Sequence, residues 1–149
     1  MLALLLTAAL SGCSALPGGS DDLPDLSEEE AAACARLVDA LPDPLAGEEL
    51  TGSDDRTASW GGIELTCGVE EPEAYDEFAA CIQVRRVGWF VPDSELEDLT
   101  GDATATALTT TPYVALHVPG ELRGAGVDLM LTQLARPMKA ELEAGDPCR

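Results

Sequence analysis

The sequence contains few aromatic residues, few basic residues and a single histidine, and each shortage narrows the possible functions. Aromatic side chains make up 4% of the 149 residues, so the core must be built mostly from Leu, Val and Ala. Eight Lys and Arg residues stand against 28 Asp and Glu residues, which gives a formal net charge of −20. Affinity for nucleic acid comes largely from neutralising phosphates, so we expect no nucleic-acid partner and no electrostatic docking on anionic lipid.

The single histidine, His117, restricts the chemistry further. It alternates with Tyr113 and Ala115, off the apolar face of its predicted strand, and we interpret it as a surface or loop-packed residue. A hydrolase that pairs His117 with a carboxylate is the least favoured of our functional hypotheses, and we predict no catalytic residue. One histidine in a chain with oxidised cysteines is also a poor basis for zinc, so we expect neither a metal nor a cofactor.

The first ten residues are almost wholly apolar. As a helix they would rise only about 15 Å, half the hydrocarbon core of a bilayer, so they predict a signal peptide over residues 1–12 rather than a membrane span. Leu10-Ser11-Gly12-Cys13 follows directly and resembles a bacterial lipobox, in which the cysteine thiol receives a diacylglycerol. We therefore predict that Cys13 is lipidated and that the membrane is a partner. A chance cysteine after an ordinary secretory signal is the alternative.

Residues 14–26 are small, acidic and interrupted by Pro and Gly, which is typical of a flexible tether. Fully extended, this stretch could hold a domain up to about 40 Å from a membrane. The chain then divides into a signal peptide (residues 1–12), a lipidated cysteine with its acidic tether (residues 13–26) and one domain (residues 27–149). This organisation predicts a protein on the outer face of the cell membrane.

Two segments of the domain have clear patterns. Ser27 and Glu30 have the spacing of a capping box, which predicts a helix from there to about Leu41. The stretch from Trp60 to Val69 predicts a central strand, because apolar residues recur at every second position and would face the core. The core-facing residues of this strand are Ile63, Leu65, Cys67 and Val69.

The stretch from Cys81 to Val91 changes its apolar phase midway. A two-residue hairpin turn at Arg85 and Arg86 would restore a single apolar face. Neither arginine favours a positive φ, so a bulge is the alternative. Farther on, the pattern predicts an edge-like strand rich in threonine over residues 103–110.

Two more elements complete the domain. Residues 113–118 predict a clear strand, and a second helix is predicted from about Gly126, where Pro137 should kink it or split it in two. The order of helix, antiparallel strands and helix indicates an α+β fold. We predict a two-layer domain in which a sheet of about five strands carries the N-terminal and the C-terminal helix on one face.

Four cysteines remain once Cys13 is assigned to lipid, and an even set in an exported chain predicts two disulfides. Our preferred pairing is Cys67–Cys81 with Cys34–Cys148. Adjacent antiparallel strands would bring the first pair within bridging distance, and two helices on one sheet face would bring the second. The main alternative is Cys34–Cys67 with Cys81–Cys148, because Cys34 and Cys67 both face the predicted core.

Trp60 and Trp89 lie beside glycines on predicted strands and could form a ligand-stacking wall, although such tryptophans more often belong to the core. Our first functional hypothesis is a non-enzymatic lipoprotein that binds or scaffolds an envelope protein or ligand. The second is a small-ligand binding module with a pocket at Trp60 and Trp89, which a hydrophobic pocket between sheet and helices would favour. The hydrolase that uses His117 comes third.

Several short motifs, spread over most of the predicted mature chain, are shared with one protein family. These motifs are Cys13, Cys34 followed by Ala40-Leu41-Pro42, Trp60-Gly61, Leu65 to Val69 with Pro72, Val84 to Trp89, Tyr113-Val114 and Val118-Pro119. In them the chain resembles the actinobacterial lipoproteins grouped as domain of unknown function 3515. Members often carry Asn-Gly where this chain has Arg85 and Arg86, which supports the hairpin and makes this turn a departure. The resemblance implies a lipid-anchored envelope protein and implies no reaction.

Overall fold

The computed structural model describes residues 23–76 and 78–148, so the predicted signal peptide, Cys13 and most of the predicted tether lie outside the described residues. The elements follow one another as α1 (Glu28–Asp39), β1 (Leu50–Ser53), β2 (Thr57–Trp60), β3 (Ile63–Val69), β4 (Ile82–Val84), β5 (Val87–Phe90), α2 (Asp93–Glu97), β6 (Ala103–Ala107), β7 (Thr110–Thr111), β8 (Tyr113–Val118), the 3₁₀ helix η2 (Gly120–Ala125), α3 (Val127–Glu141) and β9 (Glu143–Ala144).

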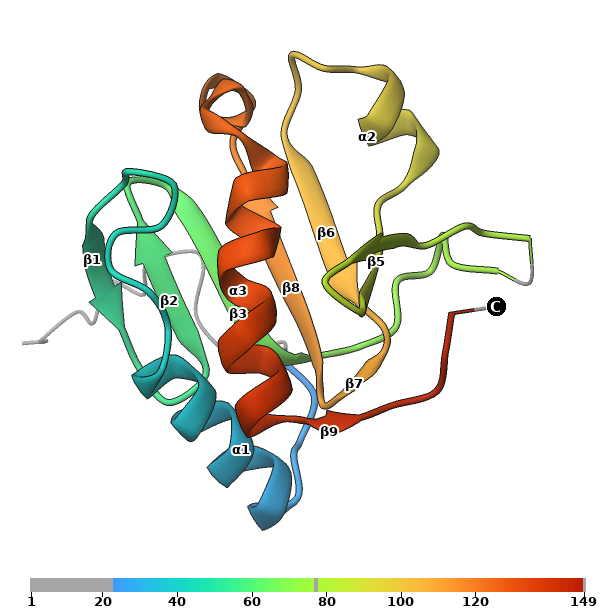
Figure 1. The fold of residues 1–149 in the computed structure, drawn as a ribbon. Coiled ribbons are helices and arrows are strands. Elements are labelled where there is room, and N and C mark those ends of the chain that lie inside the picture. Colours follow the sequence, from blue (N-terminus) through green and yellow to red (C-terminus); the bar gives the residue numbers. More distant parts are fainter. Residues whose placement is uncertain (1–22, 77, 149) are drawn as a thin grey trace, which may run out of the picture.

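These elements form two layers (Figure 1). Seven strands make one antiparallel sheet in the order β1-β2-β3-β8-β6-β5-β4, and β7 pairs separately with β9. The two long helices, α1 and α3, lie next to each other on one face of this sheet. The predicted α+β fold with both helices on one face is confirmed, and the sheet has seven strands rather than the predicted five.

Helix α1 begins where the sequence predicts. Glu30 N donates to Ser27 Oγ at 3.2 Å, and Ser27 N donates to the Glu30 carboxylate at 2.9 Å, which completes the capping box. The hydrogen bonds from the backbone N–H and the hydroxyl of Ser27 lower the pKa of the Glu30 carboxyl. Cys34 and Leu37 are fully buried, so α1 packs against the core by the face that the sequence predicts.

The stretch from Trp60 to Val69 is a tight hairpin followed by a strand, rather than one strand throughout. Gly61 and Gly62, with φ of +58° and +108°, join β2 to β3 as a two-residue turn in which Trp60 pairs with Ile63. Glycine adopts such conformations without the strain that a side chain would add. Beyond the turn the predicted alternation holds for Ile63, Leu65 and Cys67, which are fully buried. The prediction that Val69 faces the core is wrong, because a bulge between Cys67 and Val69 shifts the register, and Val69 is only partly buried.

The predicted hairpin at Arg85 and Arg86 is confirmed. Strand β4 pairs with β5 in the expected register, with Ile82 opposite Trp89. The two arginines have φ of 52° and 73°, which is the left-handed region that a two-residue turn of this kind requires. Two large side chains thus occupy positions where Asn and Gly are preferred.

The prediction of an edge-like strand over residues 103–110 is wrong. Strand β6 ends at Ala107 and lies inside the sheet, between β8 and β5. Its alanines face the core, whereas Thr104 and Thr106 pair with His117 and Ala115 on the opposite face. A strand can therefore be rich in threonine and still be central, because the small alanines between the threonines carry the buried face.

Helix α3 continues through Pro137 as one helix, so the predicted split does not occur. Pro137 is buried, and its neighbours Leu134 and Met138 have no exposed surface. A proline inside a helix removes one backbone hydrogen bond. The apolar face that α3 buries against the sheet offsets this loss, because tertiary packing supplies most helix stability in proteins.

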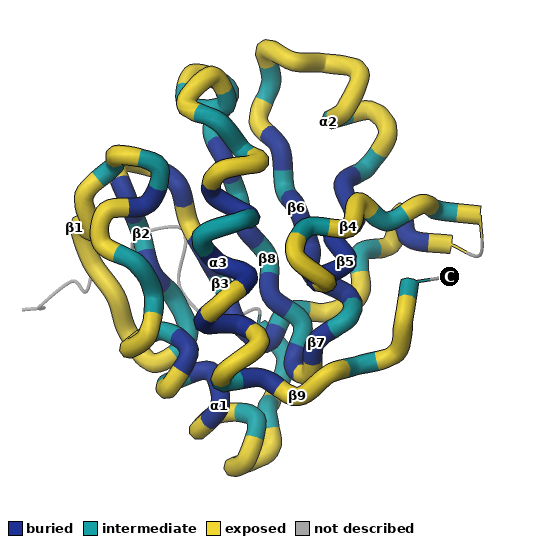
Figure 2. The backbone as a smooth tube through the Cα atoms, in the orientation of Figure 1, coloured by how far each residue is buried: buried dark blue, intermediate teal, exposed yellow. Residues whose placement is uncertain are grey.

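The main core lies between the sheet and the two helices, and dark blue segments in Figure 2 mark its strands and the inner face of α3. A second, smaller cluster of Tyr75, Phe90 and Leu108 is separate from it. The rings of Tyr75 and Phe90 meet edge to face with their centroids 5.2 Å apart. Phe90 alternates with the core residue Trp89, so the loop between β3 and β4 covers part of the opposite sheet face.

Two disulfides staple the domain, and our preferred pairing is wrong. The bonds join Cys34 to Cys67 and Cys81 to Cys148, with Cα–Cα distances of 5.6 Å and 6.0 Å, which is the alternative pairing. Cys67 belongs to β3 and Cys81 precedes β4, and β8, β6 and β5 lie between these strands. Four strand spacings amount to about 19 Å, far beyond the reach of a disulfide. The error lies in assuming that strands consecutive in sequence are neighbours in the sheet.

Candidate functional site

The two candidate tryptophans belong to the core and form no ligand wall. Trp60 and Trp89 have no exposed surface, and three strands separate β2 from β5. Trp60 Nε1 donates to the Pro42 carbonyl oxygen at 3.0 Å and so holds the loop that follows α1. The core interpretation of both residues is correct, and the pocket that our second hypothesis places at Trp60 and Trp89 is wrong.

His117 lies on the sheet face that points away from the helices, and its side chain is 39% exposed. This placement confirms the interpretation as a surface residue. Its Nδ1 is 3.2 Å from Thr104 Oγ1, and its Nε2 is 3.7 Å from an Asp102 carboxylate oxygen. A hydroxyl, an imidazole and a carboxylate are also the components of a hydrolase site. Here the three groups link the end of β8 to the start of β6.

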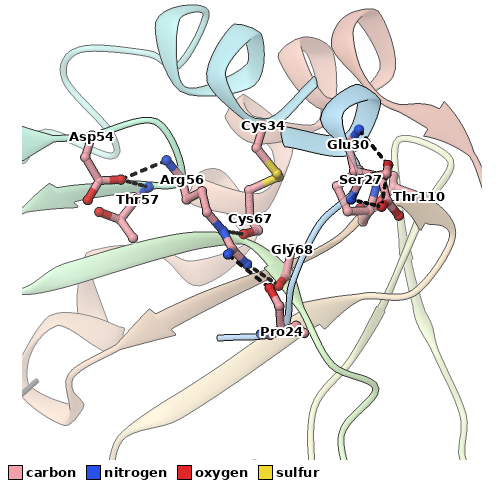
Figure 3. Close-up of a disulfide and its surroundings, with 11 residues drawn as sticks. Pro24, Ser27, Glu30, Cys34, Asp54, Arg56, Thr57, Cys67, Gly68 and Thr110 are labelled. Carbon is pink, nitrogen blue, oxygen red and sulfur yellow. Dashed lines mark hydrogen bonds between the residues drawn. A yellow bond between two sulfur atoms is a disulfide. The ribbon is translucent and has the colours of Figure 1, made fainter. Parts of the chain in front are cut away.

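Arg56 fastens the start of the described chain to the sheet (Figure 3). Its guanidinium donates to the carbonyl oxygens of Cys67 at 3.1 Å, Gly68 at 2.6 Å and Pro24 at 3.1 Å. Gly68 has a φ of +78° and makes a bulge, and a β carbon added there would lie 2.7 Å from Leu26 Cδ1. Leu26 also packs against the main core. The last residues of the predicted tether are therefore part of the folded domain, and we call this region the tether attachment.

The loop that carries Arg56 is itself held by Asp54. Asp54 Oδ1 accepts hydrogen bonds from Arg56 N and Thr57 N, each at 2.7 Å. The bond from the Arg56 N–H is the largest cause that lowers the pKa of the Asp54 carboxyl. Cys67 N in turn donates to the Arg56 carbonyl oxygen at 2.8 Å, and Cys67 is bonded to Cys34. The tether attachment thus reaches α1 through one disulfide (Figure 3).

An apolar pocket lies near the other end of β8, where the sheet splits. Strand β5 pairs with β6 only through Trp89 and Phe90, and the chain then leaves the sheet to form α2. Helix α2 replaces part of the missing pairing, because the Glu95 carboxylate accepts a hydrogen bond from Thr104 N at 2.6 Å. Figure 1 shows α2 beside the end of β6 that β5 does not reach.

This pocket, which we call the α2 pocket, has a volume of about 150 Å³ and a mostly apolar wall. Ala103 and Ala105 of β6 line it opposite α3, and they pair with Val118 and Leu116 of β8. Leu131 of α3 completes this buried part. Protein interiors are close-packed, so the pocket is the volume that larger side chains on β6 would fill.

Arg123 of η2 holds α2 in place. Its guanidinium donates to the carbonyl oxygens of Asp98 at 2.5 Å, Gly101 at 3.0 Å and Glu95 at 2.9 Å. Hydrogen bonds to the Asp98 carboxylate from the hydroxyl and N–H of Thr100, and from Gly101 N, lower the pKa of the Asp98 carboxyl. Helix α2, all of which is described, contains no buried residue, so it depends on these polar contacts for its position.

The tether attachment and the α2 pocket lie at opposite ends of β8. Tyr113 pairs with Val69 beside the tether attachment, whereas Val118 pairs with Ala103 at the pocket. The six residues of β8 span about 17 Å. The described chain therefore enters the domain at one end of the sheet, and the pocket lies at the other. Figure 1 shows α2 at this second end.

The sequence patterns did not indicate Arg56, Arg123 or the α2 pocket as features of the site. Arg56 follows two aspartates and has the pattern of a solvated loop residue, because nothing local shows that three carbonyls converge on it. A signal for the pocket was present in the alanine at every second position of residues 103–107. Such small residues on the buried face of an inner strand leave space unless a neighbour fills it.

Residues 23–76 and 78–148 contain neither a metal cluster nor a membrane-spanning helix. No group of three or more His, Cys, Asp or Glu side chains in these residues is arranged to hold a metal ion. In the same residues, no helix combines the length and the apolar character needed to cross a bilayer.

The fold and the site define a class of protein: a small α+β domain stapled by two disulfides, which are bonds that persist in oxidising compartments outside the cytoplasm. The chain belongs to the family described as protein of unknown function (DUF3515), which it matches over residues 1–147. The predicted membership in domain of unknown function 3515 is thereby confirmed. No curated protein and no solved structure shows a significant match to the chain.

Proposed function

We propose that this protein is a lipid-anchored, non-enzymatic binding domain of the cell envelope, held at the outer face of the cell membrane by a diacylglycerol on Cys13. The observation that supports this most directly is the tether attachment. Arg56 binds the Pro24 carbonyl, and Leu26 packs over Gly68. A force on the tether would pass through these contacts to β3, and through the Cys34–Cys67 disulfide to α1. Such contacts would fix the orientation of a domain that is held by its N-terminal end.

The tether attachment also suggests how the domain faces the membrane. Because Pro24 and Leu26 are bound to the domain, only residues 14–22 of the predicted tether precede the attached segment, and nine residues can span at most about 30 Å. The attached end of β8 then faces the membrane, and the α2 pocket faces away from it. This orientation favours a role in which the pocket end meets an envelope ligand or partner.

The first test concerns the anchor. Expressed in a suitable bacterium, the full chain should incorporate a fatty-acid analogue and partition into the membrane, whereas Cys13→Ala should be unlabelled and soluble. Cys148→Ser is the matched control, because it removes a cysteine but leaves Cys13 in place. Equal labelling of Cys13→Ala would reject the lipid anchor.

The second test concerns the binding role and uses crosslinking from the two ends of the molecule. A photoactivatable residue at Leu99, which is 71% exposed near α2, should capture an envelope partner. The same residue at Asp25, beside the tether attachment, should capture less of it. Capture from Asp25 alone would contradict the proposed orientation.

A further inference from the structure

We propose that the α2 pocket binds a small organic cation: an amine whose apolar group, about six carbons in size, enters the pocket while its charged nitrogen stays at the rim. This inference rests on the proposed role as a binding domain. It does not depend on the lipid anchor.

The size of the ligand follows from the interior of the pocket. The volume of about 150 Å³ matches that of dry cavities that accept a benzene-sized group. Leu116 and Leu131 are almost wholly buried and offer no polar atom. Ala105 is also buried, and its small side chain sets the free depth. The interior therefore suits a short alkyl chain or one ring, and it offers no partner for a polar group.

The mouth of the pocket supports the same conclusion. Ile82 of β4 and Leu96 of α2 line it, and they are 41% and 43% exposed. Large apolar side chains that stay exposed beside a cavity are typical of a binding surface. A ligand in the pocket would cover part of both side chains, and this burial adds to its affinity.

The charge of the ligand follows from the rim. Asp128 is exposed at the first turn of α3, and it is the one acidic residue in the lining of the pocket. Arg123 is the only basic residue in the lining, and its guanidinium already binds three carbonyl oxygens. In the described part of the chain the ion pairs are Arg36–Glu141 and His117–Asp102, so Asp128 has no cationic partner.

This arrangement favours an amine over a carboxylate. The N-terminal end of a helix would by itself attract an anion, but Asp128 already supplies a negative charge at that end of α3. A second anion would meet the charge of Asp128 and the net charge of −20. An ammonium group would instead be attracted to Asp128, and the ammonium group would stay hydrated at the rim.

The test uses three probes with the same six-carbon chain: hexylammonium, hexanol and hexanoate. They are titrated into the full chain carrying Cys13→Ala, and binding is followed by chemical shifts of the methyl groups that line the pocket. We expect saturable binding in the order amine, alcohol, acid, with the amine favoured over the acid by about fivefold at low salt. Added salt should reduce this preference, because the rim is exposed.

Two variants separate the apolar contact from the charge. Ala105→Leu fills the pocket and should abolish binding of all three probes, while Ala115→Leu adds the same bulk on the opposite sheet face and should not. Asp128→Asn keeps the pocket open, and should leave hexanol binding unchanged while it removes the advantage of the amine. Because Asp128 is exposed, this second variant does not depend on repacking the core.

The outcomes decide the inference independently of the anchor. It is overturned if hexylammonium does not saturate, if Ala105→Leu binds it as well as the parent chain does, or if Asp128→Asn keeps the full preference for the amine. Loss of binding with intact fatty-acid labelling at Cys13 would reject this inference alone. Binding without labelling would reject the anchor alone.

Discussion

Two of the eight basic residues bind backbone carbonyl oxygens rather than carboxylates. Arg56 binds three of them at the tether attachment, and Arg123 binds three beside the α2 pocket. A guanidinium has five donors in a planar fork, so it can satisfy several carbonyls where the backbone makes a bulge or an irregular loop. In a chain with a net charge of −20, these two arginines therefore connect backbone segments rather than pair with acidic side chains. A lysine could not replace them fully, because its ammonium group lacks the planar set of five donors.

Removing the hydrogen bonds that Arg56 donates to three carbonyl oxygens should destabilise the domain. We expect Arg56→Ala to lower the free energy of unfolding by about 2–3 kcal/mol, because three carbonyl oxygens lose a charged donor. Arg56→Lys should recover only part of this loss. Urea denaturation measures the effect, and Arg136→Ala, at an exposed position of α3, should change stability by less than about 0.5 kcal/mol.

A second measurement separates the tether attachment from general stability. In Arg56→Ala, proteolysis between Leu23 and Leu26 should become faster under conditions in which the rest of the domain stays folded. If proteolysis of this segment were as slow as in the parent chain, Arg56 would not be the residue that attaches the segment to the sheet.

The Asp54 carboxylate gives stability a defined dependence on pH. Its pKa is lowered in the folded state from the ordinary value of 3.8, so its contribution is present above that pH and is lost as the pH falls through the lowered pKa. We expect Asp54→Ala to cost about 0.5–1 kcal/mol at pH 7, a modest amount because the side chain is exposed. The difference should shrink toward pH 3.

Chemical denaturation of both chains at several pH values checks this expectation. Asp55→Ala removes a neighbouring exposed carboxylate, and no hydrogen bond of the described structure involves that side chain. A cost for Asp54→Ala that stayed constant down to pH 3 would show that the carboxylate charge does not matter to the turn.

At the scale of elements, the β4–β5 hairpin carries avoidable strain. Arg85 and Arg86 adopt φ of 52° and 73°, where a side chain costs free energy that glycine does not. We expect the double substitution Arg85→Asn with Arg86→Gly to raise the free energy of unfolding by about 1–2 kcal/mol, because Asn-Gly is the preferred pair for this turn.

The matched control for this prediction is Arg85→Gln with Arg86→Gln. It removes the same two charges but does not improve the turn, so it should leave stability unchanged or lower. Thermal or urea unfolding of the three chains measures the difference. Equal stabilisation by the glutamine pair would assign the gain to charge instead of backbone conformation.

The elements differ in how far the sequence could predict them. The capping box at Ser27 and the alternation at Ile63 to Cys67 are local patterns, and both hold in the structure. Strand β1 has no such pattern, since all four of its residues are exposed, and this is one reason why seven strands exceed the predicted five. Gly61 and Gly62 did signal a turn, but the apolar run around them favoured one continuous strand.

At the scale of the whole molecule, the order of strands was the part that local patterns could not supply. Strand β8 enters the sheet between β3 and β6, which separates Cys67 from Cys81. The C-terminal tail is redirected as well, because β9 pairs with β7 and Gly145 N donates to the Thr109 carbonyl oxygen at 3.0 Å. That path takes Cys148 to Cys81 and away from Cys34. Each step depends on contacts between distant segments, which no local pattern records.

The two disulfides differ in exposure, and this difference predicts their behaviour. Cys34 and Cys67 have no exposed surface, whereas Cys81 and Cys148 are only partly buried, beside the smaller cluster. Exchange with a thiol requires access to a sulfur atom. We therefore expect a mild reductant to open Cys81–Cys148 first and to leave Cys34–Cys67 intact. Alkylation of the released thiols followed by peptide mapping identifies the order.

Variants that lack one bond each should separate the two contributions. The sequence separations of 33 and 67 residues correspond to nominal stabilisation of roughly 4 kcal/mol per bond in the chain-entropy model. Cys81→Ser with Cys148→Ser should lose at most this amount and keep the sheet, because the bond joins the tail to the edge of the molecule. Cys34→Ala with Cys67→Ala should lose more, since it also leaves a cavity between α1 and β3. Opening of Cys34–Cys67 first, or a larger loss from the Cys81 and Cys148 variant, would mean that the C-terminal tail supports the core and not only the edge of the domain.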